Sequence, residues 1–193
     1  MKGLLDEGNE VFISKNDDPK RKLKYTLEII KVKNNLVGVN THFANKIAYH
    51  GLSKNLIKEV SNSNNIKPEV FFDKETRFDF LIEKNQQKIF VEVKNVTLFR
   101  EEKIAEFPDA ITSRGSKHLK ALIQAIKKGY KSYLLFLVQI QGAESFKIAK
   151  DIDKEYYENY LLARKAGVKF LAYRCKINSK EIIVEKKIKI INA

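Results

Sequence analysis

One apolar segment, residues 132–140, constrains the fold of this chain more than any other part of the sequence. From Tyr133 to Val138 it lacks the alternation of polar and apolar residues that marks a strand with one face in water. An unbroken apolar run of this kind predicts a strand buried on both faces, as at the centre of a sheet covered by helices. The segment therefore favours an α/β fold.

The segments around this run are ordered in a way that also indicates α/β architecture. Amphipathic spacing predicts helices near residues 41–51, 116–128 and 154–166. Strand patterns cover residues 10–15, 25–33, 36–39, 66–72, 76–83, 88–96, 168–176 and 181–191, whereas residues 98–112 are irregular and polar. Strands interspersed with helices imply an α/β domain with a mixed sheet. Because the sequence has neither Gly-x-Gly-x-x-Gly nor a phosphate-loop motif, it argues against a Rossmann enzyme and a P-loop NTPase.

The charge balance narrows the choice of partner. The chain carries a net charge of +13, from 37 Lys and Arg against 24 Asp and Glu. Such an excess favours a polyanionic partner such as nucleic acid. A compositional alternative stays open, because Lys, Asn and Ile are abundant together here, as they are in proteins of AT-rich genomes.

The sequence predicts no membrane partner. No run of about 18 apolar residues occurs, so no transmembrane span is expected. The stretch from Met1 to Leu5 is followed at once by Asp6 and Glu7, so no signal peptide is expected. Cys175 is the single cysteine, which excludes an internal disulfide and suits a reducing compartment. The expected location is cytoplasmic.

Two strand patterns within residues 76–94 carry the residues that are most informative about chemistry. Alternation predicts that Phe78, Phe80 and Ile82 share one face of the first strand. In the second strand, Glu92 and Lys94 share a face. A loop over residues 84–87 would join the two strands into a hairpin in which Asp79 lies directly opposite Glu92.

That facing pair of carboxylates predicts a cation site. Two carboxylates in direct opposition repel each other, and a shared proton or a divalent cation would relieve the repulsion. Mg²⁺ commonly takes one or two carboxylates together with waters and substrate phosphate. Lys94 would lie beside that cation and orient the attacking water or hold a phosphate. The pattern therefore predicts phosphodiester hydrolysis; the alternative is a set of solvent-facing charges on a half-exposed hairpin.

A second polar cluster lies at the start of the helix predicted over residues 116–128. Arg114, Lys117 and His118 gather there, where backbone N–H groups and the helix dipole favour a bound phosphate. A solvated first turn is the alternative. Asp109 is a candidate to approach the same cation, and Glu59 is either a further carboxylate of the site or a surface residue.

Several long motifs, in order along nearly the whole chain, resemble the sugar fermentation stimulation protein family (SfsA). They are residues 17–23, 37–41 with 44–45, 77–80, 91–98, 107–110, 112–119 and 171–174. The resemblance implies an N-terminal OB-like β-barrel joined to a restriction-endonuclease-like domain of the PD-(D/E)xK type. Residues 1–38 would be a remnant of the barrel and residues 39–193 the nuclease-like domain. An incomplete barrel is expected, because the chain begins just before the motif of residues 3–5, which several strands precede in the family.

The resemblance also implies a catalytic site and a cofactor. Asp79, Glu92 and Lys94 match the nuclease signature. The carbonyl of Val93 would join the two carboxylates as a ligand of Mg²⁺ or Mn²⁺, and Thr97 would be auxiliary to the site. No small-molecule cofactor is implied.

DNA is the partner that the resemblance implies, together with a role in regulating sugar metabolism genes. Lys20, Arg21 and Lys22 would add DNA contacts from the barrel remnant, and the oligomeric state is left open. One alternative is a DNA-binding regulator that keeps the nuclease fold without turnover. Nuclease-like chemistry on RNA is a third hypothesis.

Overall fold

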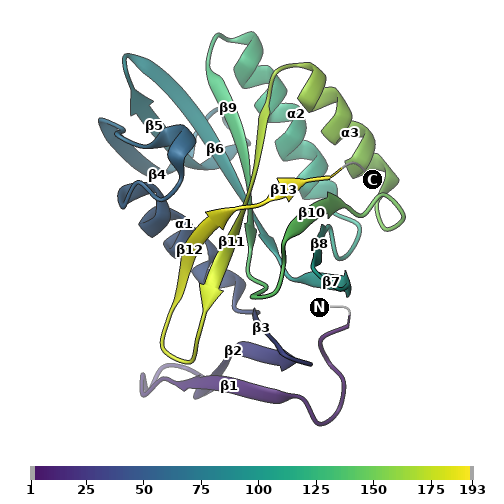
Figure 1. Cartoon of the computed structure of the whole chain (residues 1–193). Coiled ribbons are helices and arrows are strands. Elements are labelled where there is room, and N and C mark those ends of the chain that lie inside the picture. Colours follow the sequence, from purple (N-terminus) through teal and green to yellow (C-terminus); the bar gives the residue numbers. More distant parts are fainter. Residues whose placement is uncertain (1–2, 192–193) are drawn as a thin grey trace.

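The structure is a computed structural model that describes residues 3–191 (Figure 1). Met1 and Lys2, which begin the segment in which no signal peptide is expected, lie outside the residues that the structure describes. The helices are α1 (Ala44–Ser53), α2 (Ser113–Lys127) and α3 (Lys154–Lys165), with 3-10 turns η1 (Thr41–Phe43) and η2 (Lys58–Val60). The strands are β1 (Glu10–Lys15), β2 (Tyr25–Val32), β3 (Asn35–Gly38), β4 (Asn65–Phe71), β5 (Arg77–Lys84), β6 (Gln87–Val96), β7 (Leu98–Glu101), β8 (Ile104–Phe107), β9 (Lys131–Val138), β10 (Ser145–Ile148), β11 (Lys169–Ile177), β12 (Ile182–Lys187) and β13 (Lys189–Ile190).

A six-stranded mixed sheet forms the centre of the molecule, in the order β12-β11-β9-β6-β5-β4. Strand β9 runs parallel to both of its neighbours, β6 and β11, and every residue after its first is buried. This confirms the strand predicted from the apolar run. Burial on both faces explains why its sequence shows no polar alternation.

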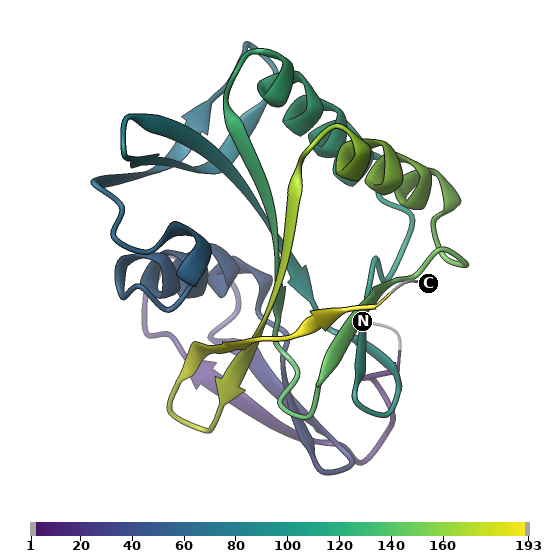
Figure 2. The same ribbon diagram turned by 45° about the horizontal axis from the view of Figure 1, so that its top comes forward.

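Helices cover both faces of the central sheet. Helices α2 and α3 lie side by side on one face, and α1 packs on the other (Figures 1 and 2). Successive residues of β9 accordingly alternate between two cores: Phe136 packs in the core that contains Leu119 of α2, and Leu135 in the core that contains Ile47 of α1. The mixed α/β fold predicted from the sequence is confirmed. No helix in residues 3–191 combines the length and the apolar character that crossing a bilayer would require.

The N-terminal part forms a separate three-stranded sheet, β1-β2-β3, below the central sheet in Figure 1. Within the described residues this sheet is open and does not close into a barrel. Its last strand connects to the segment after β9: the N–H of Gly38 donates to the carbonyl of Gln139 at 2.9 Å, and Val37 forms a bridge with Ile140. The domain boundary after residue 38 stays a prediction.

Residues 98–112, expected to be irregular, contain a strand pair, so that expectation was wrong for residues 98–107. Strands β7 and β8 form a hairpin that joins β10 and β13 in a second sheet, in the order β13-β10-β8-β7. The charged residues of these strands form ion pairs with one another. Arg100 Nε donates to Glu106 Oε2 at 2.7 Å, and the Glu106 side chain is fully buried. The partner strand β10 comes from far along the chain, so local pattern does not indicate the pairing.

Candidate metal and nucleic-acid site

The hairpin β5–β6 positions the carboxylates of the site, and its register agrees with the prediction from Glu83 to Phe80, whereas the predicted pairing of Asp79 with Glu92 lies beyond the end of the ladder and is not formed. Glu83 pairs with Lys88 and Phe80 pairs with Val91. The turn is tighter than the expected loop over 84–87, because Asn85 and Gln86 alone form it, with φ of 48° and 62°. Positive φ at both central residues is the geometry that matches the twist of a two-residue hairpin.

The backbone pairing between β5 and β6 ends at Phe80. Before this point, the side chains of β5 no longer alternate between the two faces of the sheet as predicted. Phe80 and Ile82 pack in the core on the α1 side, whereas Phe78 packs in the core on the α2 side. The expectation that Phe78 shares their face is therefore wrong. The physical reason lies at Asp79, whose Oδ2 accepts a hydrogen bond from the backbone N–H of Val93 at 2.7 Å. At this position, the backbone N–H of Val93 in β6 therefore bonds to the Asp79 side chain and not to the backbone of β5.

Asp79 is partly buried and is held from two sides. Besides the Val93 N–H, the amide Nδ2 of Asn45 donates to Asp79 Oδ1 at 2.7 Å. Burial, followed by the negative charge of Glu92, raises the pKa of Asp79 to about 6, against the lowering effect of these two hydrogen bonds. Asn45 comes from the first turn of α1, and the sequence marks it only as part of a family motif, without a role in the site.

Glu92 is the most deeply buried charge of the site, with 4% of its side chain exposed. Its Oε1 accepts a hydrogen bond from Lys94 Nζ at 2.7 Å and contacts Nδ1 of His118. Burial alone would raise the pKa of Glu92, but the hydrogen bond with His118 and the charge of Lys94 outweigh it and lower the pKa. The other oxygen, Oε2, is buried and has no hydrogen-bond partner among the described residues.

These features fit a divalent cation that retains water. No three His, Cys, Asp or Glu side chains within residues 3–191 gather into a preformed metal cage. Mg²⁺ does not need such a cage, because it commonly binds through one or two carboxylates and keeps several waters. The unpartnered Oε2 of Glu92 is the kind of buried acceptor that a cation would satisfy. The same positive charge would also offset the electrostatic repulsion between Asp79 and Glu92.

Helix α2 brings the predicted basic residues to one groove. The helix begins at Ser113, earlier than predicted, because the hydroxyl of Thr112 caps it by accepting from the N–H of Gly115 at 3.0 Å. Arg114, Lys117 and His118 line a groove of about 680 Å³ between this helix and the turn that joins β4 to β5. His118 also contacts Glu92, so it links the groove to the carboxylates.

The position of α2 is fixed by a buried carboxylate of the neighbouring helix. Asp153 caps α3 by accepting from the N–H of Tyr156 at 2.8 Å. The same side chain accepts from the N–H of Thr112 at 2.8 Å. One carboxylate therefore holds the starts of both helices together, and the basic residues of α2 depend on it for their placement.

Asp79, Glu92 and Lys94 do not themselves line this groove, and the remaining predicted residues lie elsewhere among the described residues. Glu59 accepts hydrogen bonds from Tyr173 Oη at 2.7 Å and from Lys187 Nζ at 2.6 Å. Thr97 is buried directly after β6, and Asp109 is partly buried after the cis peptide bond between Phe107 and Pro108. Lys20, Arg21 and Lys22 lie exposed in the connection from β1 to β2.

Comparison with known proteins assigns the N-terminal part and the remainder of the chain to two family profiles. A family profile described as "Sugar fermentation stimulation protein RE domain" matches residues 42–181. A second profile, "SfsA N-terminal OB domain", matches residues 1–39. The predicted fold class is thereby confirmed: a restriction-endonuclease-like core with a mixed sheet, preceded by a partial OB-like β domain that forms no closed barrel within residues 3–191.

Individual relatives agree with these profiles. The chain is 84% identical over 193 residues to a sugar fermentation stimulation protein homolog of Pelagibacter ubique, covering 100% of this chain and 83% of that protein. A homolog of Pseudoalteromonas atlantica is 41% identical, with 99% and 82% covered. The solved structure of Pyrococcus furiosus SfsA in complex with Ca²⁺ superposes with a TM-score of 0.88 at 26% identity, covering 97% of this chain and 80% of that one.

Proposed function

This chain belongs to the sugar fermentation stimulation protein family, and on that premise we propose that it binds DNA and hydrolyses its phosphodiester bonds with the help of a divalent cation. One observation carries the proposal. Glu92 is buried, repels Asp79 electrostatically, has one carboxylate oxygen without a hydrogen-bond partner among the described residues, and contacts a histidine that lines a basic groove. A buried anionic site next to a cationic groove suits a cation and a polyanion together.

The carboxylates and one carbonyl would hold the cation. We assign Asp79, Glu92 and the carbonyl of Val93 as ligands of Mg²⁺ or Mn²⁺, and the Ca²⁺ complex of the P. furiosus relative supports the use of a divalent ion. A bound divalent cation polarises phosphoryl oxygens and lowers the pKa of water. The N–H of Val93 holds Asp79 at 2.7 Å, so the same peptide strand would orient two of the ligands.

The basic residues of the site have separate roles in this proposal. Lys94, with 13% of its side chain exposed, is the ammonium group nearest the buried carboxylate and would position the attacking water. His118 orients Glu92 through its contact with Oε1. Arg114 and Lys117 would bind backbone phosphates in the groove and bring the scissile bond to the carboxylates.

A cleavage assay on supercoiled plasmid and short DNA in Mg²⁺ or Mn²⁺ tests the proposal. We expect nicking by the wild type and its loss in Glu92→Gln, which keeps the shape of the side chain and removes its charge. Glu83→Gln is the matched control, because Glu83 lies on the same hairpin and pairs with Lys67 at the surface. Equal nicking by the wild type and Glu92→Gln would show a contaminating nuclease and overturn the proposal.

A DNA-binding regulator without turnover is the second candidate. It is favoured by the sharing of Glu92 Oε1 between Lys94 and His118, and by the lack of a third acidic or histidine ligand within residues 3–191. It predicts DNA binding that survives Glu92→Gln and no cleavage with any divalent ion. The family name favours a role in sugar metabolism for either candidate, which we propose as regulation of the corresponding genes.

A further inference from the structure

The groove beside the carboxylates contains an exposed aromatic ring as well as basic residues. Phe71, the last residue of β4, leaves 67% of its surface exposed and lines the same groove as Arg114 and Lys117. Arg77 places its guanidinium carbon 5.7 Å from the centre of that ring, and its Nε pairs with Glu69 at 2.9 Å. The groove therefore combines an exposed phenyl ring, a guanidinium group in contact with that ring, and several basic side chains.

This combination points to unpaired bases. Proteins that bind single-stranded nucleic acid combine a cationic groove for the backbone with aromatic rings on which bases stack. In an intact duplex the bases are already stacked on one another, and positive charge alone is enough to bind its phosphates. An exposed ring adds binding energy only where a base is free to leave the stack.

We propose that the groove binds single-stranded DNA, or the unpaired segment of a DNA junction, with a base stacked on Phe71. Arg114 and Lys117 would then bind the backbone on the α2 side of the groove. His118 lines the groove and contacts Glu92, so a strand held in this way would pass the residue that links the groove to the carboxylates. The inference names the substrate class of the proposed function, and it rests on that function for any cleavage.

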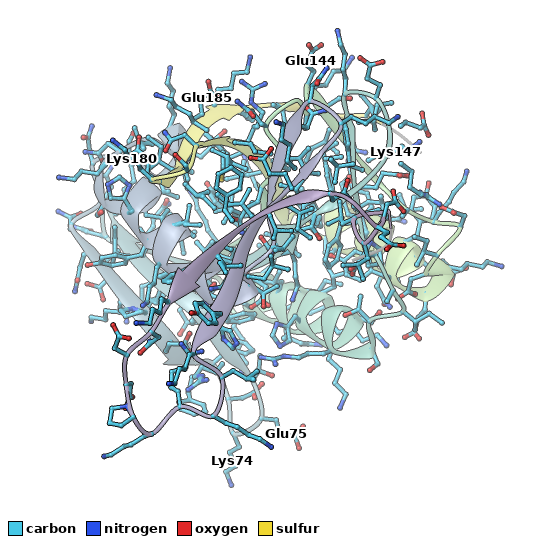
Figure 3. The ribbon with its side chains drawn as sticks, turned by 90° about the horizontal axis from the view of Figure 1, so that it is seen from below. Lys74, Glu75, Glu144, Lys147, Lys180 and Glu185 are labelled. Atoms are coloured by element: carbon cyan, nitrogen blue, oxygen red, sulfur yellow. The ribbon has the colours of Figure 1, made fainter. Side chains whose placement is uncertain are left out.

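The rim of the groove agrees with entry of a single strand. Lys74 and Glu75 project from the turn between β4 and β5, at the edge of the molecule in Figure 3. Glu75 lines the groove opposite the basic face of α2. The negative charge of Glu75 would repel a second phosphate backbone on that side of the groove, where the charge of Arg77 is paired with Glu69.

Binding without cleavage tests the inference. Fluorescence anisotropy in EDTA would compare a labelled single strand, the blunt duplex of the same sequence and a duplex with a single-stranded overhang. We expect wild type to bind the single strand and the overhang more tightly than the blunt duplex. Phe71→Ala should weaken single-strand binding roughly 5- to 150-fold and leave duplex binding unchanged, because stacking on an aromatic ring contributes about 1–3 kcal/mol per base. Phe71→Trp should retain the affinity.

A matched control separates the ring in this groove from exposed rings in general. Phe43 is 39% exposed and lies under Lys46 Nζ at 4.9 Å, but it lines a different cavity, against β1 and β2. Phe43→Ala should leave single-strand binding unchanged. Melting curves of both alanine variants would show that they fold.

The outcomes distinguish this inference from the proposed function. Tighter binding of the blunt duplex by wild type, or equal loss of both substrates in Phe71→Ala, would overturn the inference even if the wild type cleaves DNA. Single-strand binding that depends on Phe71 supports it even if no variant cleaves DNA with any metal.

Discussion

Nδ1 of His118, on helix α2, contacts Oε1 of Glu92, on strand β6, and this contact joins the groove to the buried carboxylate. Lys94 donates to the same oxygen at 2.7 Å. Both partners therefore contact the same oxygen of the carboxylate and leave Oε2 without a partner among the described residues. The arrangement keeps Glu92 ionised in a buried setting and leaves one of its oxygens available.

His118→Ala should destabilise the protein. The variant removes a hydrogen-bond partner from a buried charged carboxylate, and such bonds contribute about 1.5–3 kcal/mol. We expect the free energy of unfolding, measured by urea denaturation, to fall by that amount. His50→Ala, at an exposed position of α1, should change it by less than about 0.5 kcal/mol. Equal stability of wild type and His118→Ala would show that the contact carries no energy.

Lys94→Met should separate cation binding from catalysis. The variant keeps the aliphatic length of the side chain and leaves Asp79 and Glu92 in place. We expect Mn²⁺ binding to persist while cleavage falls by at least about 100-fold, the typical loss when one electrostatic group of an active site is removed. Lys88→Met, on the same strand and opposite Glu83, is the matched control and should leave both properties unchanged. Retained cleavage in Lys94→Met would exclude a role for the ammonium group.

Arg114→Ala and Lys117→Ala should weaken DNA binding through the phosphates. Each lost phosphate contact should make the slope of log K against log salt shallower by about 0.7 for a single strand. The measurement is a salt titration of binding for the wild type and each variant. Lys180→Ala is the control, because Lys180 lies on the opposite side of the molecule from Glu75 (Figure 3). An unchanged slope in both groove variants would place the DNA elsewhere.

The ion-pair network of the second sheet predicts a dependence of stability on acid. The hydrogen bond from Arg100, followed by the charge of Arg100, lowers the pKa of Asp151 to about 2, from an ordinary value of 3.8. A lowered folded-state pKa means that the stabilisation is present above about pH 4 and is lost as the pH falls toward 2. Asp151→Asn should therefore be less stable than the wild type at pH 5, and the difference should narrow as the pH falls toward 2. A difference that stays constant over this range would contradict the assignment.

The sequence predicted the strands that matter most, for reasons visible in the structure. Strand β9 is apolar because both of its faces are covered, and the register of Glu83 with Lys88 follows from the position of the turn. The site residues Glu92 and Lys94 share a face of β6, as strand alternation requires.

Other features depend on contacts between distant segments, which local patterns do not contain. Asn45 holds Asp79 across 34 positions of sequence, and β8 pairs with β10 only in the folded chain. Phe78 departs from the predicted alternation because a carboxylate, and not the β5 backbone, bonds to Val93. In the sequence, Phe71 is indistinguishable from an ordinary strand residue, and only the fold shows that its ring is exposed beside Arg77.

Mn²⁺ binding by isothermal titration tests the central claim, that Asp79 and Glu92 hold a divalent cation, most directly. We predict saturable binding to the wild type and to Glu83→Gln, and its loss in Asp79→Asn and Glu92→Gln, with all four proteins shown to be folded by their melting curves. The same Mn²⁺ affinity in Glu92→Gln as in the wild type would contradict the account.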